Sequence, residues 1–544
     1  MSSVLARWFA SSPLRRRQFR YFYVGSVGSA LAYTMQATVA SWMMATLTPS
    51  ALLVALVQTA STAPSLLLAL LAGSLADIVN RRRIILGAQV VLVAATIVLG
   101  AAALAGVMNP AMLLALTFLV GAAFTFYLPA QQASVNELVR REDLPKAVAL
   151  GAVAFNVARA IGPALAGAIV AWAGTGSALL ASAAGFGVTI AALRGWRVRP
   201  PALPGVPETL ISGVLAGLRF ARHSEAMRAL IVRNVIFCLC GSSLWALMPL
   251  VARDQLGLDA GGFGLLLSTF GAGAVVCALS IPRQLQRRPL NTVVTSSVVL
   301  SAAATLLIAA TNITAVALVG AFAAGAAWVG VLASLSAGTQ SAAPAWVRAR
   351  SMALILLAVQ ASLAVGSAIW GALASVAGTA ATLAAAAGAM LLLHALNRRV
   401  RVDFSAEADV TPYAALPDLA LKVEPMPDDG PVLVQVDYRI DFEHRAAFMH
   451  AIRAVEPTRR RNGASSWRVF HDVGEDGRFV ERFIIESWAE YIRSRSRMTV
   501  ADRQLQDVVA ALQRADVPIR ISRLIGVDLD EELPSAGDDP GHDA

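Results

Sequence analysis

Charged residues are scarce in this chain: Asp, Glu, Lys and Arg make up 15% of its 544 residues, whereas soluble proteins carry about 25%. Cysteine is also rare, and Cys238, Cys240 and Cys277 all lie inside apolar runs. Together with 57% hydrophobic residues and a mean hydropathy of +0.62, these shortages exclude a soluble enzyme, a disordered protein and a secreted disulfide scaffold. The composition is that of a polytopic helical membrane protein.

Signatures of catalysis and cofactor binding are missing as well. No stretch matches a phosphate-binding P-loop, so direct use of ATP is not expected. The tail histidines His444, His450 and His471 have no cysteine or acid at metal-ligand spacing, and we expect them to be solvated. We therefore predict no catalytic residues, no metal site and no cofactor.

Long apolar runs predict the fold, because a spanning helix needs about 20 mostly apolar residues. Twelve segments qualify, at about 19–47, 51–79, 83–106, 111–136, 147–173, 176–194, 229–252, 260–282, 290–309, 313–338, 351–376 and 379–398. The predicted fold is an all-α membrane protein with twelve transmembrane helices in two six-helix halves, followed by a small α+β ferredoxin-like soluble domain.

The placement of positive charge supports this count. If the N-terminus and alternate loops share one side, that side receives 26 Lys and Arg residues, and the other receives Arg253 alone. Basic loops stay in the cytoplasm, so both termini are predicted to be cytoplasmic in a bacterial-type plasma (inner) membrane. The net charge of +10 is explained by these loops, and no nucleic-acid partner is expected.

The composition changes after Arg401, from apolar to acidic. Residues 431–440, 465–471, 478–487 and 518–525 alternate like strands, with helices expected up to about Arg461, capped by Asp441, and over 488–514. This β-α-β-β-α-β order is that of a ferredoxin-like domain. The predicted divisions are an N-terminal segment (1–18), the first half (19–194), a central loop (195–228), the second half (229–398), a linker (399–430), the soluble domain (431–526) and an acidic disordered tail (527–544).

The two halves share a glycine pattern. A shift of 204 residues places Gly162, Gly167 and Gly174 on Gly366, Gly371 and Gly378, and it places Asn156 on Gln360. Parallel halves of this kind occur in transporters, with the substrate path between them.

Gly73, Asp77, Arg81 and Arg82 resemble the loop between spans two and three in the major facilitator superfamily. Ile78 and Asn80 depart from that pattern. The resemblance implies a gating motif in which Gly73 allows close helix approach and Asp77 pairs with an arginine or a helix N-terminus. The alternative is that the arginines only anchor the topology.

Gly162, Pro163 and Gly167 in span five resemble a motif that marks exporters of the same superfamily. Pro163 has no N–H, so it frees the carbonyl of Arg159 and bends the helix. Helix packing and gating are both open readings of this motif.

A longer stretch resembles the enterobactin-exporter-like branch, also called transmembrane secretion effectors: Pro129-Ala-Gln-Gln-Ala, Glu137 to Pro145, and Phe155 to Pro163. The tail's Glu486-Ser-Trp-Ala-Glu-Tyr resembles dimeric domains of the antibiotic-biosynthesis-monooxygenase type. The resemblance implies a secondary transporter that exports a small organic molecule, such as a siderophore, drug or metabolite, by alternating access. Proton antiport is implied too, as is dimerisation through the tail.

Arg159 is the only Lys or Arg close to the middle of a predicted span, and no Asp or Glu lies at that depth. A midplane arginine costs at least ~2.5–3.5 kcal/mol on insertion scales and is expected to face the bundle interior. Arg159 therefore either binds a polar or anionic substrate or bonds carbonyls freed by proline; Asn156 shares its face.

Other mid-span polar and aromatic residues are candidates for the same cavity, although ordinary packing is the alternative for each. In the superfamily, spans one, four, seven and ten line the cavity, which implies Gln36, Tyr127, Trp245 and Trp328; Gln360 is added by the repeat. Two rival functions remain open: an importer of the same fold, and a membrane-tethered enzyme acting through its tail.

Overall fold

The computed structural model describes residues 13–193, 210–397, 410–411, 413 and 425–527. All or most of the predicted segments 1–18, 399–430 and 527–544 lies outside these residues, as does the first part of the central loop. The chain divides into two compact units. Unit 1 comprises 1–207, 229–338 and 353–403, and unit 2 comprises 208–228, 339–352 and 404–544.

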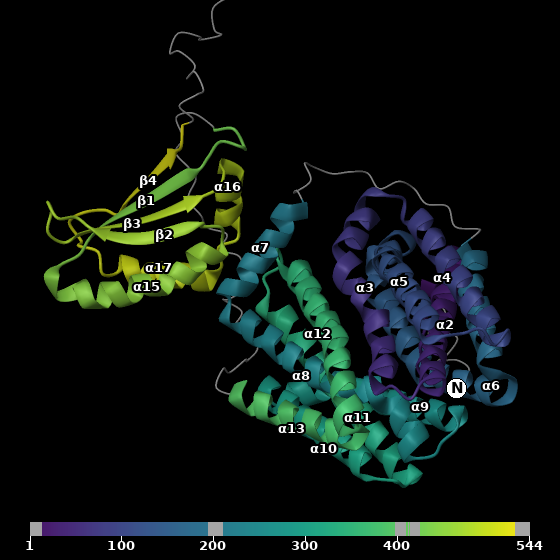
Figure 1. Ribbon diagram of the computed structural model, residues 1–544. Coiled ribbons are helices and arrows are strands. Elements are labelled where there is room, and N and C mark those ends of the chain that lie inside the picture. The colour runs from purple at the N-terminus through teal and green to yellow at the C-terminus, as the bar shows by residue number, and fades with distance from the viewer. Residues whose placement is uncertain (1–12, 194–209, 398–409, 412, 414–424, 528–544) are drawn as a thin grey trace, which may run out of the picture. The chain divides into compact units, whose positions relative to one another are not determined.

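Unit 1 is a bundle of long helices (Figure 1). They are α2 (Arg17–Leu47), α3 (Ala51–Ile78), α4 (Arg81–Leu104), α5 (Pro110–Leu138), α6 (Leu144–Ala192), α8 (Glu225–Leu250), α9 (Ala260–Arg287), α10 (Leu290–Ala310), α11 (Thr314–Ala342), α12 (Arg348–Ala377) and α13 (Thr379–Asn397). The last residues of α11 and the first residues of α8 and α12 belong to unit 2. Polar caps set several starts: Ser50, Asn109 and Asp259 each accept a hydrogen bond from a backbone N–H of the first turn.

Ten of the described helices are long and apolar enough to cross a membrane, and two features separate this number from the predicted twelve. α6 counts once, although its 49 residues are broken at Gly174, where φ is 82° and ψ is 170°. The predicted spans 147–173 and 176–194 are the two limbs on either side of that break. α2, with 31 residues, is not among the ten because it carries basic, amide and hydroxyl side chains.

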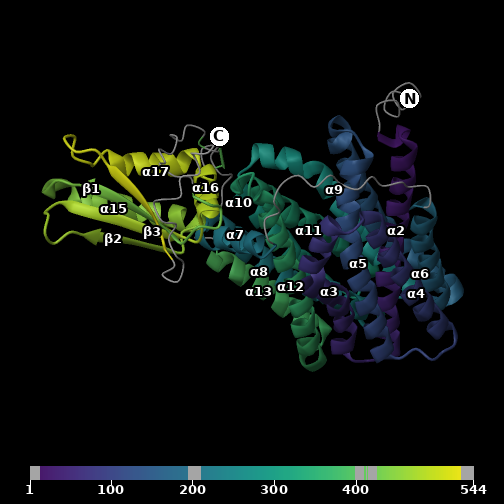
Figure 2. The same ribbon diagram turned by 90° about the horizontal axis from the view of Figure 1, so that it is seen from above.

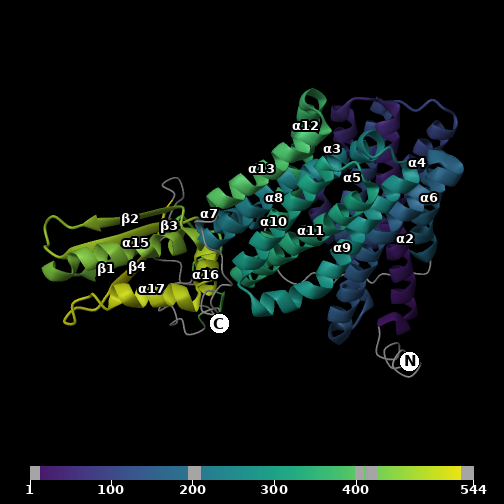
Figure 3. The ribbon, with the colours of Figure 1, turned by 90° about the horizontal axis from the view of Figure 1, so that it is seen from below.

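Helices distant in the sequence lie side by side in unit 1. α2, α4 and α6 pack together, as Figure 2 shows. α3 and α12 are neighbours in all three views (Figures 1, 2 and 3), and Thr59 Oγ1 of α3 donates a 2.8 Å hydrogen bond to the carbonyl of Ala364 in α12. α6 likewise packs on α9.

Unit 2 contains a four-stranded antiparallel sheet in the order β2-β3-β1-β4. Its strands are β1 (Val432–Arg439), β2 (Ser466–His471), β3 (Arg478–Ile485) and β4 (Arg520–Ile525), and α15 (Arg445–Arg461), α16 (Trp488–Ser496) and α17 (Val500–Ala510) complete the fold. The four predicted strands are confirmed. Alternate residues of β1, from Val432 to Tyr438, point into a core formed with these helices.

Two details of the tail differ from the prediction. The helix expected over 488–514 is two helices, because Thr499 and Asp502 form a capping box that starts α17. Asp441 does not cap α15: its side chain makes no cap hydrogen bond and lies 3.6 Å from Arg514.

Unit 2 also contains α7 (Leu210–His223), which lies in the predicted central loop, and the segment 339–352, which joins α11 to α12. Phe220 of α7 and Trp346 meet edge to face at 5.9 Å. Arg461 lies over the Phe220 ring at 5.9 Å, and Arg497 lies over the Trp346 ring at 4.5 Å. Cation–π contacts therefore hold the tail to segments that connect the membrane helices.

Candidate substrate site

Arg159 lies in the first limb of α6, against aromatic rings. Its guanidinium carbon is 5.6 Å from the ring centre of Trp245 in α8 and 6.0 Å from that of Phe155, one turn earlier in α6. Within the described part of the chain, no hydrogen bond or carboxylate partner is recorded for it. The aromatic faces offset part of the cost of burying this cation, but they leave its N–H donors available.

Three further rings extend this contact. Trp245 meets Phe270 of α9 at 4.7 Å and Trp328 of α11 at 5.7 Å, both edge to face, and Trp328 meets Phe237 at 5.3 Å. Gly241 makes room for Trp328, because a Cβ there would lie 3.0 Å from the ring. We call Arg159, Phe155, Trp245, Phe270 and Trp328 the arginine–aromatic site.

The Trp245 indole N–H is a second unused polar group in this site. It is buried and has no hydrogen-bond partner among the described residues. A buried donor left unsatisfied is costly, so this N–H would bond favourably to an acceptor on a ligand.

The structure brings together three of the predicted cavity residues, Arg159, Trp245 and Trp328. Tyr127 is 4% exposed and belongs to the hydrophobic core of α2, α4, α5 and α6. Gln36 is 1% exposed, and its side-chain nitrogen has no partner in the described chain.

The remaining pair, Asn156 and Gln360, is partly buried. The Asn156 amide donates 2.8 Å to the carbonyl of Ala152 in its own helix, and no contact with Arg159 is recorded. Sequence reasoning missed Phe155 and Phe270. Phe155 had a signal, since it precedes Arg159 by four residues on one helix face, whereas Phe270 is sequence-distant.

The glycine–proline motif of α6 is a packing surface. A Cβ at Gly162 would lie 2.1 Å from Thr34 of α2, and one at Gly167 would lie 2.5 Å from the carbonyl of Ala260 in α9. The carbonyl of Arg159, which Pro163 deprives of its helical partner, lies against α9, where a Cβ at Gly271 would be 2.9 Å from it.

The matching glycines of α12 make corresponding contacts. Gly366 packs on Leu239 and Ser242 of α8, and Gly371 packs on Ala55 of α3, where a Cβ would lie only 2.4 Å away. Gly174 and Gly378, which follow these contacts at the ends of their helical segments, both have positive φ, of 82° and 83°. The sequence repeat is thus accompanied by a repeat of packing roles.

Two of these contacts, that of Gly167 with Ala260 and that of Gly371 with Ala55, lie at one end of unit 1. Gly167, Ala260, Ala55 and Gly371 lie near the turns at 48–50, 174–175, 256–259 and 378. Arg159 is eight residues from Gly167, which is about 12 Å along a helix. We call this end, where α6 packs on α9 and α12 packs on α3, the closed end. The arginine–aromatic site lies deeper in the bundle.

The motif between α3 and α4 is partly described. Arg81 pairs with Glu137 of α5 and donates 3.3 Å to the carbonyl of Ala133. Asn80, which departs from the family pattern, caps α4 by accepting from the N–H of Arg82 at 3.0 Å. A Cβ at Gly73 would meet nothing within 4 Å among the described residues, and the expected close helix approach stays a prediction.

The side chain of Asp77, the other member of that motif, lies outside the described part of the chain; its backbone belongs to the last turn of α3. The expected pairing of this carboxylate stays a prediction.

Three comparisons relate this chain to known proteins. The model of the transmembrane secretion effector family matches residues 9–530. The chain belongs to this family. It is 25% identical over 228 residues to the MFS-type transporter y4rN of Sinorhizobium fredii, a match that covers 40% of the chain and 55% of the relative's length. The chain therefore matches about half of the length of that curated relative.

Solved structures show the fold of unit 1. A bacterial homologue of the human lysosomal transporter Spinster, inward-facing and unoccupied, has a TM-score of 0.57 at 13% identity and covers 71% of the chain and 95% of its own. The nucleoside transporter NupG has a TM-score of 0.57 at 15% identity, and the match covers 70% of this chain and 98% of NupG. A POT family transporter has 0.57 at 12% identity, with coverages of 70% and 95%.

The family model and these neighbours show a multi-pass membrane protein with the major facilitator fold.

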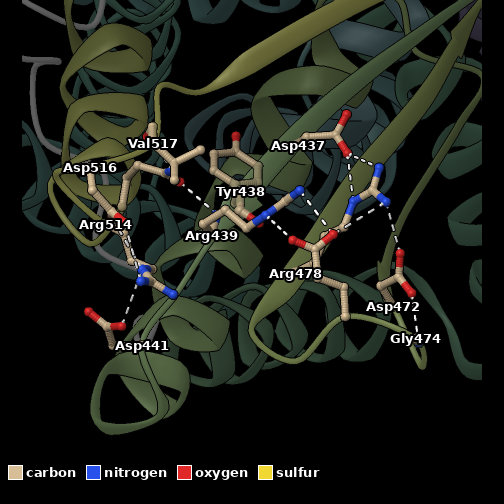
Figure 4. A network of polar contacts seen from close by, with 12 residues as sticks. Asp437, Tyr438, Arg439, Asp441, Asp472, Gly474, Arg478, Arg514, Asp516 and Val517 are labelled. Carbon is tan, nitrogen blue, oxygen red and sulfur yellow. Dashed lines mark hydrogen bonds and ion pairs between the residues drawn. The ribbon is translucent and has the colours of Figure 1, made fainter.

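The tail is stabilised by ion pairs, and Figure 4 shows one network at the hairpin end of its sheet. Arg478 binds Asp437 at 2.7 Å and Asp472 at 2.9 Å. Burial raises the pKa of Asp437, but hydrogen bonds from Gln435 and Arg478 outweigh it, so its pKa lies below the usual value. His444, His450 and His471 are exposed, as expected, and no metal-holding group of three is found in the described chain.

Proposed function

We propose that this transporter exports a small organic molecule, of the siderophore, drug or metabolite type, across the plasma (inner) membrane by alternating access. The observation that carries the proposal is the arginine–aromatic site: a cation on α6, without a recorded carboxylate, against Trp245 of α8. Such a pair suits an anionic or polar substrate with a flat or apolar body, because the charge and the ring faces bind different parts of it.

The proposed architecture has twelve spans in two six-helix halves. The two limbs of α6 count separately because of the break at Gly174, and α2 completes the number. The paired packing roles of Gly162 with Gly366 and of Gly167 with Gly371 support two related halves.

The direction of opening follows from the loop charges. Arg253 is the one basic residue of the loops at the closed end, whereas the loops at the opposite end carry the other 26 loop Lys and Arg residues. Because basic loops stay in the cytoplasm, we assign the closed end to the periplasm and both termini to the cytoplasm. A transporter closed toward the periplasm is ready to take substrate from the cytoplasm, as an exporter must. Protons are the proposed coupling ion, on family grounds, and Asp77 the proposed gating acid.

The soluble tail is proposed to be a ferredoxin-like accessory domain that can dimerise. Support comes from its strand order β2-β3-β1-β4, with α15 and α17 on one face of the sheet, as Figure 1 shows.

Efflux by an Arg159→Ala variant, at matched membrane abundance, tests the proposed function. Export of anionic substrates should fall at least tenfold, because a charge-assisted hydrogen bond is worth ~1.5–3 kcal/mol. Arg253→Ala is the matched control, since this arginine pairs with its neighbour Asp254 and is expected to lie in a periplasmic turn. Normal efflux by Arg159→Ala across a substrate panel would rule out the site.

A further inference from the structure

A cavity of about 140 Å³ lies within unit 2, between the sheet and its helices. Its lining comes from three strands of the sheet and from all three helices of the tail. An engineered protein cavity of roughly 150 Å³ holds one benzene molecule, so the ligand that fits here is about the size of one ring.

The floor of the cavity is apolar. Val434 and Val436 of β1, Phe483 and Ile485 of β3 and Ile521 of β4 all lie on one face of the sheet, because they are paired in register or are two residues apart. A surface of this kind binds the hydrocarbon part of a ligand.

The polar part of the lining is cationic. It includes four arginines and no acidic residue. Arg459 is neutralised by buried Glu481, at 3.0 Å. Arg523, by contrast, donates 2.5 Å to the neutral hydroxyl of Tyr491, its one recorded polar partner in the described chain. Its positive charge is therefore available to an anion.

A buried acceptor adds a second requirement. Asn462 is 9% exposed, and its side-chain nitrogen donates 3.3 Å to Asp502, which fixes the orientation of the amide. Its side-chain oxygen is buried and has no hydrogen-bond partner among the described residues. An orphaned acceptor in a cavity wall is satisfied by a donor on a ligand.

We propose that this cavity is a binding site for a small organic acid: its carboxylate pairs with Arg523, its ring or branched body rests on the sheet, and a hydroxyl or amino group donates to Asn462. The site is built entirely from the tail, and it does not depend on the assignment of Arg159 to transport.

Equilibrium binding of radiolabelled 3-hydroxybenzoate to the full-length protein in nanodiscs tests the proposal. We expect saturable binding that weakens at least tenfold in Arg523→Gln, which removes the charge, and in Ile521→Trp, which fills the cavity. Ile521 is 48% exposed, so the larger side chain can be accommodated in the fold. Arg520→Gln, on the opposite face of β4, is the matched control and should bind within twofold of wild type.

Competitors test each part of the ligand. Benzoate lacks the hydroxyl donor and should compete several-fold less well than unlabelled 3-hydroxybenzoate. Benzyl alcohol, which lacks the carboxylate, and inorganic phosphate, which lacks the ring, should compete at least tenfold less well. Absence of saturable binding, unchanged binding in both Arg523→Gln and Ile521→Trp, or equal competition by phosphate would overturn the proposal. Binding that disappears in Arg159→Ala but survives both tail variants would also overturn it, and would assign the acid to the transport site instead.

Discussion

Several arginines of this protein lie over aromatic rings, and two of them, one from each unit, differ in their counter-charge. Arg459 in the tail lies 4.7 Å from the Phe483 ring and pairs with Glu481, which is fully buried. Arg159 in the membrane bundle lies 5.6 Å from the Trp245 ring, and no carboxylate is recorded beside it in the described residues.

The Glu481 carboxylate shows what a satisfied buried charge requires. It accepts from Arg459, from the indole of Trp467 at 2.9 Å and from the hydroxyl of Tyr438 at 3.1 Å. Burial raises the pKa of Glu481, but Arg459 and these hydrogen bonds outweigh burial and hold its pKa below the usual value. This network leaves nothing for a ligand to complete, so we read Arg459 as structural and Arg159 as a binding group.

Removing the counter-charge in the tail should have the largest effect. Glu481→Ala leaves Arg459 buried without its partner, which costs about 3–5 kcal/mol. Hydrogen exchange of the full-length protein should show the tail opening, while the membrane helices keep their protection. Glu456→Ala is the matched control, because Glu456 pairs with Arg460 on the surface of α15, and such a pair is worth about 0.5 kcal/mol. Equal effects of the two variants would contradict the comparison.

Supplying a counter-charge in the membrane should have the next largest effect. Phe155→Glu places a carboxylate one turn before Arg159, in the favourable order for a pair on a helix. Export should fall about 100-fold, equivalent to ~2.7 kcal/mol, because the cation is then neutralised internally. Phe155→Leu removes the ring without adding charge and should lower export only a few-fold. Full export by Phe155→Glu would show that the free charge of Arg159 is not used.

Sequence reasoning could find Arg159 but not its surroundings. A lone cation in an apolar run can be recognised from the sequence alone, and so can the expected boundary between two spans near Gly174. The meeting of Arg159 with Trp245 and Trp328 depends on how α6, α8 and α11 pack, and no local pattern encodes that.

In the tail, too, local patterns were predictable from the sequence and contacts between distant elements were not. Alternation predicted all four strands, and the Thr499–Asp502 capping box that splits α16 from α17 was readable as a T-x-x-D signal. The partnership of Glu481 with Arg459, 22 residues apart on different elements, had no such signal.

A smaller effect is expected from a substitution that moves the Trp328 ring and leaves the charge of Arg159 unchanged. Gly241→Ala puts a Cβ 3.0 Å from Trp328, which must shift by a few tenths of an ångström and carry Trp245 with it. Overpacking of this size costs about 1 kcal/mol, so export should fall roughly three- to tenfold with little loss of stability. Gly388→Ala, where a Cβ meets nothing within 4 Å, should export normally. Identical export by the two variants would separate Trp328 from the site.

The smallest effect is expected at His223, which becomes a cation when it binds a proton at low pH. Burial lowers the pKa of His223, at the end of α7, and Arg460, Arg222 and Arg228 lower it further against a weak opposing effect of Glu456. Because the folded pKa lies below the unfolded value of about 6.5, stability is present above that pH and is lost as the pH falls through it. Acidification from pH 7.5 to 5.5 should therefore destabilise unit 2 by less than about 1 kcal/mol, since solvent screens this half-exposed group. Thermal unfolding monitored by tryptophan fluorescence should show the loss in wild type and a smaller one in His223→Gln. An equal loss in both would mean that an added positive charge beside these arginines is tolerated, and that arginine neighbours alone do not make an unpaired cation costly.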